Sequence, residues 1–144
     1  MIIKGKDPIN IAGSGIAGMT AAINLSTRGR TVIIHEKHNR IGDSRDGDFE
    51  GLENWIFAHT VPEFFNVCCV DFNALPATPI FDFKVHLRGL KPVRITSPEP
   101  FFYIVSRGTG NASIDNYMAN ICRANKVQFS FGQALTKEDA DIYA

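Results

Sequence analysis

The stretch Asn10-Ile-Ala-Gly13-Ser-Gly15-Ile-Ala-Gly18 decides the fold of this 144-residue chain. A short apolar strand, Asn10 to Ala12, runs directly into three glycines with the spacing GxGxxG, and the residues after them predict a helix to about Arg28. Gly29 follows where a helix-ending glycine is expected. Thr31 to His35 is a continuous β-branched run, which is typical of a parallel strand covered on both faces. The pattern therefore predicts a β-α-β unit.

Each glycine of the motif has its own physical role. Gly13 permits the tight turn, Gly15 lets a pyrophosphate approach the backbone, and Gly18 lets helix and strand pack closely. The helix N-terminus adds free N–H groups and roughly half a unit of positive charge. The sequence thus predicts a phosphate-binding turn made of Gly13, Ser14, Gly15, Ile16, Ala17 and Gly18.

An acidic residue, Glu36, follows the second strand, 18 residues after the last glycine of the motif. A carboxylate at this place can accept hydrogen bonds from ribose hydroxyls and would repel a 2′-phosphate, so the site fits FAD or NAD better than NADP. The alternative is a glycine-rich turn of an ordinary sheet protein, with Glu36 as a surface acid. The strand–turn–helix context favours the dinucleotide site, but the β-α-β unit alone does not separate FAD from NAD.

The middle of the chain differs in character. Residues 39–51 are rich in glycine, aspartate and arginine and predict a loop. Phe81–Arg88 and Val93–Thr96 alternate apolar and polar residues around a turn, and Phe101–Val105 is a third candidate strand. We therefore expect an antiparallel insertion: 49–105 as a substrate-side segment, with 1–48 and 106–144 as the dinucleotide-binding layer.

Phenylalanines are concentrated in this middle segment. Nine of the eleven in the chain lie between Phe49 and Phe102. They can line a pocket for an apolar or prenyl-like substrate, or they can form a plain hydrophobic core. Residue type alone slightly favours the core.

The last third returns to helix and strand. Ser113 can cap a helix that carries apolar residues at helical spacing up to Cys122. Val127–Phe131 alternates like a strand, and Ala140–Ala144 resembles the start of another. The predicted fold class is therefore α/β, a Rossmann-type β-α-β layer with an antiparallel β insertion, with three or four parallel strands.

Composition restricts the partners. The chain has 15 basic and 15 acidic residues, so a net charge of zero provides no general attraction to nucleic acid or an anionic membrane. The uncharged run Ile9–Leu25 is interrupted by glycines and is too short for a membrane-spanning helix. Three cysteines without metal or disulfide spacing suit a reducing compartment, and we expect a cytoplasmic protein. No metal site and no catalytic acid or base is identified.

Several segments resemble a known group of enzymes. Gly13 through Gly42 looks like the N-terminal FAD-binding signature of flavoprotein oxidoreductases and monooxygenases, with Glu36-Lys37 at the second strand end. Gly47–Trp55 is similar to a segment of geranylgeranyl reductase-like NAD(P)/FAD-dependent oxidoreductases. Phe102–Gly108, the helix at 113–125 and Ala140–Ile142 look like the same group.

The resemblance implies a fold, a cofactor and a chemistry. The fold is that of p-hydroxybenzoate hydroxylase, in which an antiparallel sheet interrupts a Rossmann FAD domain. FAD is the implied cofactor and NAD(P)H the implied reductant, with hydride passed to an alkene or a similar acceptor in a small-molecule or lipid-like substrate. Lys37 belongs to the implied cofactor site, Arg107 would reach the ribityl or pyrophosphate region, and Arg45 would lie nearby on the loop after Glu36.

The chain also departs from this group. Members continue past Asp141-Ile142 with a glycine-bearing strand end and a Gly-Asp motif, so we expect an N-terminal portion with an incomplete flavin site. The cysteine-containing arginine–glycine stretch and the aromatic substrate motif of the prenyl reductases are missing. A non-catalytic dinucleotide-binding remnant or module and a small NAD-binding domain therefore stay open as alternatives. A homo-oligomer or a missing C-terminal portion also stays open.

Overall fold

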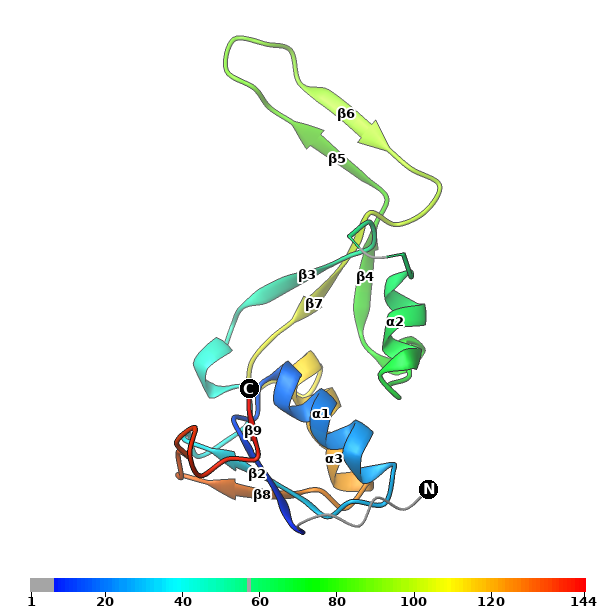
Figure 1. Ribbon diagram of the computed structural model, residues 1–144. Coiled ribbons are helices and arrows are strands. Elements are labelled where there is room, and N and C mark those ends of the chain that lie inside the picture. Colours follow the sequence, from blue (N-terminus) through cyan, green and yellow to red (C-terminus); the bar gives the residue numbers. More distant parts are fainter. Residues whose placement is uncertain (1–6, 57) are drawn as a thin grey trace.

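The computed structural model of the chain describes residues 7–56 and 58–144. Three parts follow one another in space (Figure 1): a parallel sheet with two helices, an antiparallel sheet with a third helix, and a long two-stranded hairpin. The hydrophobic core is shared by the first two parts, since Ile11 and Ile34 of the parallel sheet belong to the same buried cluster as Val61 and Val105.

The parallel sheet has the strand order β8-β2-β1-β9. Its strands are β1 (Ile9–Ala12), β2 (Val32–Glu36), β8 (Gln128–Phe131) and β9 (Ile142–Tyr143). All three pairings are parallel, with Ile11 beside Ile34 in the centre. Strands β2 and β8 are added in turn on one side of β1, and β9 is added on the opposite side of β1. The order therefore reverses between β1 and β9, and in open α/β sheets ligands bind at such a reversal, beyond the carboxyl ends of the strands.

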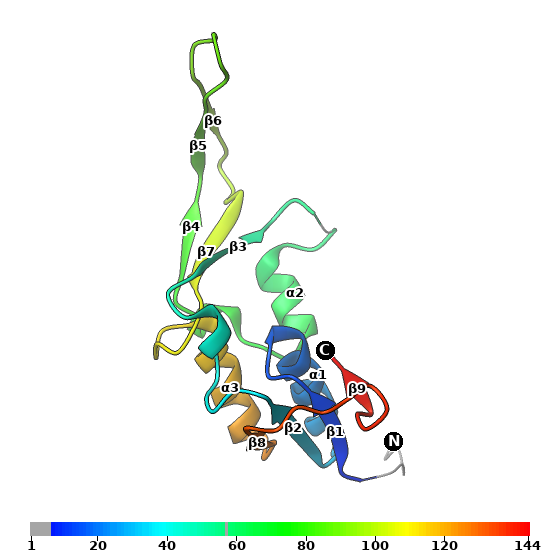
Figure 2. The same cartoon turned by 90° about the vertical axis from the view of Figure 1, so that its left-hand side faces the viewer.

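Two helices lie side by side on this sheet (Figures 1 and 2). Helix α1 (Ile16–Ser26) ends slightly before the predicted Arg28, and Gly29 follows with a φ of 80°, as a helix-ending glycine should. Helix α3 (Ile114–Ala124) begins where predicted, because the Ser113 hydroxyl accepts the N–H of Asn116 at 3.1 Å. The helices meet through fully buried side chains: Met19, Ile23, Met118 and Cys122.

The antiparallel sheet has the order β3-β7-β4. Its strands are β3 (Phe49–Glu53), β4 (Ala77–Ile80) and β7 (Phe102–Ser106). Helix α2 (Val61–Val67) packs beside it and starts with a capping box between Thr60 and Glu63. The segment expected to be loop up to Gly51 instead contains the 3₁₀ turn η1 (Asp43–Arg45) and the first residues of β3, and η2 (Phe72–Ala74) follows α2.

The hairpin consists of β5 (Asp82–Val85) and β6 (Val93–Thr96). It projects away from both sheets, and the view in Figure 2 shows it as a thin extension of β4 and β7. The first strand ends at Val85 rather than at the predicted Arg88. We call residues 81–97 the hairpin arm. The division of the chain into 1–48, 49–105 and 106–144 stays a prediction.

The slight preference for a phenylalanine core holds only in part. Only Phe72 of the middle segment is buried among the described residues; Phe49, Phe64 and Phe81 are exposed, and Phe57 lies outside the described residues. The core is mainly aliphatic, and Phe65, which is half-buried, packs against its edge. In the run Val67–Val70, Val70 is buried, Cys68 packs against the core, and Val67 is exposed.

Candidate functional site

The turn between β1 and α1 has the geometry that its glycines predict. Gly13 has a φ of 96°, a conformation that favours glycine. A side chain on Gly18 would place its Cβ 2.2 Å from the carbonyl oxygen of Gly13, so helix and turn could not approach as they do. Two of the three glycines are therefore required by the fold itself.

Gly15 differs from the other two. It is the N-cap residue of α1 with φ −67° and ψ 172°, which any residue can adopt. A Cβ on Gly15 would meet no atom within 4 Å. The fold therefore does not require glycine here; it leaves open space above the N–H groups of the first helical turn, which have no partners inside the helix.

Glu36 ends β2 and turns its carboxylate toward this turn. Its Oε2 accepts the backbone N–H of Ser14 at 2.9 Å and the Ser14 hydroxyl at 2.5 Å, and its Oε1 accepts the N–H of His38 at 2.9 Å. Burial alone would raise the pKa of Glu36, but the hydrogen bonds from Ser14 and His38 outweigh it and hold the pKa below 4.5. A buried carboxylate therefore carries its charge beside the helix N-terminus at neutral pH.

The lowered pKa of Glu36 makes the free energy of unfolding depend on pH. Its contribution is complete above the unfolded-state pKa near 4.5 and is lost as the pH falls through the lower folded-state pKa. Urea titrations between pH 7 and pH 3 should show this loss. Ser14→Ala should cost about 1.5 kcal/mol at pH 7 and flatten the acid limb. Ser26→Ala, which removes a hydroxyl bonded to the Ile23 carbonyl, should leave the acid limb unchanged; equal flattening by both variants would contradict the assignment.

Two loops meet beside the turn. Gly42, after β2, and Gly108, after β7, are so close that a Cβ on Gly42 would lie 2.3 Å from the Gly108 carbonyl oxygen. Asp46 accepts both the N–H of Thr109 at 2.8 Å and its hydroxyl at 2.5 Å. The start and the end of the antiparallel segment are therefore joined at one point.

Arg107 lies at this junction and is almost completely buried. Its Nε and Nη2 donate to the two carboxylate oxygens of Asp115 at 2.9 Å each, and its Nη1 donates to Glu50. Asp115 also accepts the N–H of Gly108 at 2.8 Å. Burial would raise the pKa of Asp115, but Arg107 and the Gly108 N–H hold it below its usual value, so the pair is ionised.

A small cavity of about 50 Å³ connects these groups; we call it the loop cavity. Its walls contain Ser14, Gly15, Glu36, His38, Arg40, Gly42, Asp43, Ser44, Arg45, Arg107 and Asp115. The structure thus brings both predicted arginines to the glycine turn. Arg45 is half exposed and pairs with Asp48 at 2.8 Å.

A second cavity of about 170 Å³, the strand-end cavity, lies on the other side of Glu36. It is lined by Ala12, Gly13, His35, Glu36, Lys37, Ala134, Leu135, Tyr143 and Ala144. These residues stand at or just beyond the carboxyl ends of the parallel strands, where the strand order reverses. Lys37 lines this cavity together with Glu36, and its place in a cofactor site stays a prediction.

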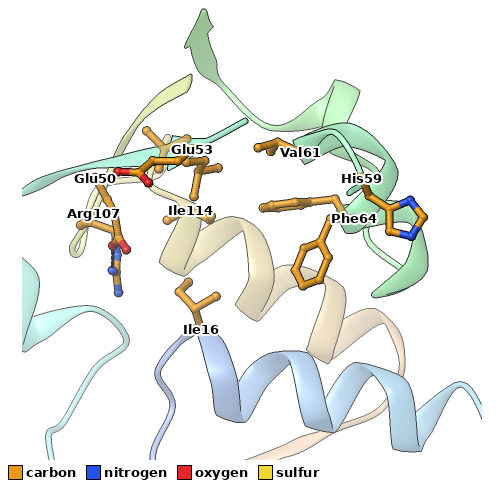
Figure 3. A pocket seen from close by; sticks show the side chains of 11 residues that line it. Ile16, Glu50, Glu53, His59, Val61, Phe64, Arg107 and Ile114 are labelled. Carbon is orange, nitrogen blue, oxygen red and sulfur yellow. Dashed lines mark hydrogen bonds and ion pairs between the residues drawn. The ribbon is translucent and has the colours of Figure 1, made fainter. Parts of the chain in front are cut away.

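On the far side of Arg107 is an apolar cavity of about 350 Å³ (Figure 3). Figure 3 shows Ile16 of α1, Ile114 of α3 and Phe64 of α2 around it, with Glu50 and Arg107 at one end. A further apolar cavity of about 460 Å³, the helix cavity, lies between the three helices and shares Ile16, Phe64 and Phe65 with the first.

The histidines form no metal centre. His35 contacts Gln133 through Nδ1 and Asn10 through Nε2, and His38 approaches Asp43 at 3.6 Å. Within residues 7–56 and 58–144 no group of three histidine, cysteine or acidic side chains is placed to hold a metal ion.

The sequence did not identify Glu50 and Asp115 as site residues. Asp115 stands in the first turn of α3, where an acid is common in any helix, so local pattern gives no signal of its pairing with Arg107. Glu50 lies on a strand whose alternation is weak. Only the fold brings these two acids to one arginine.

Two sequence comparisons find known proteins that resemble the segment around the glycine turn. The sequence profile of the NAD(P)-binding Rossmann-like domain family matches residues 11–65, which contain the glycine turn and Glu36. A 61-residue stretch, 42% of the chain, is 34% identical to the tRNA 5-methylaminomethyl-2-thiouridine biosynthesis bifunctional protein MnmC of Shewanella denitrificans, of which it covers 8%.

Solved structures share the fold over most of the chain. The tetrameric form of 2-methyl-3-hydroxypyridine-5-carboxylic acid oxygenase superimposes with a TM-score of 0.65 at 21% identity, covering 86% of this chain and 31% of that one. The structure of p-nitrophenol 4-monooxygenase of Pseudomonas putida superimposes with a TM-score of 0.58 at 12% identity, and the match covers 86% of this chain and 31% of that one. CtdE, solved in complex with FAD, superimposes with a TM-score of 0.56 at 20% identity, and the match covers 86% of this chain and 29% of that one.

The chain thus spans less than a third of the length of these solved proteins. Among the residues described, no helix has the length and apolar character needed to cross a lipid bilayer. Strand order, glycine turn and comparisons together show that the fold of this chain is a mixed α/β, Rossmann-like dinucleotide-binding fold.

Proposed function

We propose that this chain binds FAD as the N-terminal part of a flavin-dependent oxidoreductase. The observation that carries the proposal is Gly15: glycine stands at the N-cap of α1 although neither its φ nor any neighbouring atom requires it. Open space above a helix N-terminus is what a pyrophosphate needs to reach the backbone N–H groups. The residues present therefore fit a dinucleotide.

The cavities support a path for that dinucleotide along the carboxyl ends of the strands. In the proposal the strand-end cavity holds the adenosine beside Glu36 and Lys37, and the loop cavity holds the pyrophosphate beside Gly15, with Arg45 and Arg107 in its wall. The ionised Glu36 disfavours a 2′-phosphate, which supports FAD or NAD over NADP for this site.

Bound flavin would supply hydride chemistry, with a nicotinamide as the reductant and an alkene or a similar acceptor as the substrate. This chain's residues bind, orient and exclude water. Phe64, Phe65 and Ile16 make the neighbouring cavities apolar, so water is disfavoured there. No residue of the chain is assigned as a catalytic acid or base.

The proposed substrate is apolar or prenyl-like. The apolar cavity and the helix cavity have about 350 and 460 Å³ and share wall residues, so an elongated hydrocarbon would find continuous apolar surroundings. Strand β3, which contributes Glu50, Leu52 and Glu53 to the apolar cavity, also carries the segment that resembles geranylgeranyl reductases.

A second candidate is a non-catalytic dinucleotide-binding module or a small NAD-binding domain. Arg107 favours it, because three of its donors are already satisfied by Asp115 and Glu50 and are not free for a flavin phosphate. The glycine turn and Glu36 would serve NAD equally well.

An absorbance spectrum, combined with calorimetry, separates FAD binding from NAD binding. The purified 144-residue chain is incubated with FAD, desalted and scanned between 300 and 550 nm, and NAD binding is measured by calorimetry. Retained flavin absorbance at about one equivalent, with no NAD binding, supports the first proposal. A colourless protein that binds NAD supports the small NAD-binding domain, and a chain that binds neither ligand overturns both.

Glu36→Ala should reduce the affinity for FAD about 30-fold, because two ribose hydroxyls would lose a charged acceptor. FMN, which has no adenosine, provides the internal control, and its affinity should change less than threefold. Glu36 also binds Ser14 and His38, so thermal unfolding of the variant is measured alongside. Unchanged FAD affinity in a folded Glu36→Ala protein would remove the ribose role.

A further inference from the structure

The hairpin arm, residues 81–97, has little contact with the rest of the molecule. It joins the antiparallel sheet through the N–H of Ser97, which donates to the Phe81 carbonyl at 2.9 Å, and through an edge contact between the Phe83 and Phe101 rings at 5.0 Å. Figures 1 and 2 show its far end well away from both sheets. A two-stranded hairpin is only marginally stable alone in water, so a structure that projects this far suggests a binding surface.

The two faces of the arm differ in chemistry. The register pairs Phe83 with Ile95 and Val85 with Val93, which gives one face of four apolar side chains. The other face pairs Lys84 with Arg94, whose Nη2 also binds Asp82 at 2.7 Å. The arm is therefore amphipathic, and its apolar residue Val93 is 57% exposed.

The tip of the arm presents two leucines. The N–H of Leu90 donates to the Leu87 carbonyl at 3.1 Å and closes a four-residue turn, in which Gly89 has a φ of 78°. Leu87 is 57% exposed and Leu90 is 67% exposed. Exposure of leucine side chains to water is unfavourable, so transfer of these two leucines into an apolar environment would lower the free energy.

Basic residues lie on both sides of these leucines in the sequence. The arm contains four basic residues, Lys84, Arg88, Lys91 and Arg94, against a single acid, Asp82. The chain as a whole is neutral, so the rest of the molecule is correspondingly acidic. Net charge alone conceals this separation.

We propose that the hairpin arm docks on an anionic lipid surface. The basic side chains would meet the headgroups while Leu87 and Leu90 enter the interface between headgroups and acyl chains. Charge complementarity selects an anionic partner, and the leucines at the leading end select a lipid surface over nucleic acid, whose phosphate backbone would leave them in water. The inference goes beyond flavin binding and does not depend on it.

The first test is sedimentation of the 144-residue chain with vesicles of phosphatidylcholine containing 30% phosphatidylserine. We expect the chain to bind these vesicles, with a partition coefficient at least tenfold lower for vesicles of pure phosphatidylcholine. Leu87→Ser/Leu90→Ser should reduce the partition coefficient at least tenfold. Lys84→Gln/Arg88→Gln/Lys91→Gln should reduce it about 100-fold, since each basic residue near an anionic surface contributes roughly fivefold.

Matched variants outside the arm control for general effects. Val67→Ser removes an apolar side chain that is 65% exposed at the end of α2. Arg28→Gln/Arg123→Gln/Lys126→Gln removes three exposed positive charges from the helical side of the molecule. Neither control should change vesicle binding more than twofold. Circular dichroism confirms that every variant remains folded.

A second measurement reports insertion directly. Trp55 is the single tryptophan, so Trp55→Phe/Leu87→Trp places the only indole at the tip. Its emission should shift to shorter wavelength with anionic vesicles and be quenched by lipids brominated on their acyl chains. Size-exclusion chromatography and a gel-shift assay with a 20-base DNA accompany it.

Three results would overturn the proposal. Absent or charge-independent vesicle binding would do so, as would equal weakening by the arm variants and their controls. DNA binding or self-association that covers the arm, without quenching by brominated lipid, would assign the surface to a different partner.

Discussion

Gly15→Ala is expected to abolish FAD binding while leaving the protein folded. The new methyl group would occupy the open space above the first turn of α1, into which the pyrophosphate must come. Loss of two charge-assisted hydrogen bonds corresponds to about 3 kcal/mol, or more than 100-fold in affinity. The free energy of unfolding should change by about 1 kcal/mol or less, because φ is −67° and the Cβ meets no atom.

Gly18→Ala is the matched control for this experiment. Its Cβ would lie 2.2 Å from the Gly13 carbonyl oxygen, a backbone atom that cannot move aside, so we expect about 3 kcal/mol of destabilisation. Flavin retention and urea unfolding, measured on both variants, separate a ligand-facing glycine from a structural one. If Gly15→Ala retains flavin like the unaltered chain, the turn does not hold the pyrophosphate.

Asp115→Ala should destabilise the protein by about 3 kcal/mol. The substitution leaves the buried Arg107 guanidinium with only Glu50 as a charged partner and also removes the acceptor of the Gly108 N–H. The loop after β7 would lose its charged contact with α3 and keep the hydrogen bonds from the Asn116 side chain. Urea denaturation at pH 7 measures the change.

A double variant and a surface variant serve as controls for the loss of stability in Asp115→Ala. Arg107→Leu/Asp115→Leu removes both charges and should be more stable than Asp115→Ala, because no buried guanidinium remains with only one charged partner. Asp139→Ala removes an exposed acid whose carboxylate accepts the Thr136 hydroxyl, and should cost less than 1 kcal/mol. A cost below 1 kcal/mol for Asp115→Ala would show that the ion pair does not hold the junction.

The glycine turn, helices α1 and α3 and the parallel strands could be predicted because their signals are local. Gly13 and Gly18 encode a turn within six residues, and Ser113 caps the helix that follows it directly. The position of Glu36 follows from the strand that it ends. In each case the residues that determine the element are neighbours in sequence.

The remaining features depend on contacts between distant segments. Gly42 and Gly108 are far apart in the chain, and nothing local indicates that their backbones touch. The phenylalanines show the same limit: residue type indicates that Phe49 and Phe81 prefer burial, but only the fold determines whether a layer covers them. The pairing of Arg107 with Asp115 also follows from the tertiary arrangement.

The contact between the loops at Gly42 and Gly108 has an evolutionary consequence. The chain leaves the layer of the parallel sheet and returns to it at one place, where the Arg107 N–H donates to the Asp48 carbonyl at 2.8 Å. A segment with adjoining ends can lengthen or shorten outward without moving the scaffold that it leaves. Val61 and Val105 tie its inner part to the common core, so the outer strands are the part that can change with the least effect on that core. One scaffold can in this way carry interchangeable outer modules.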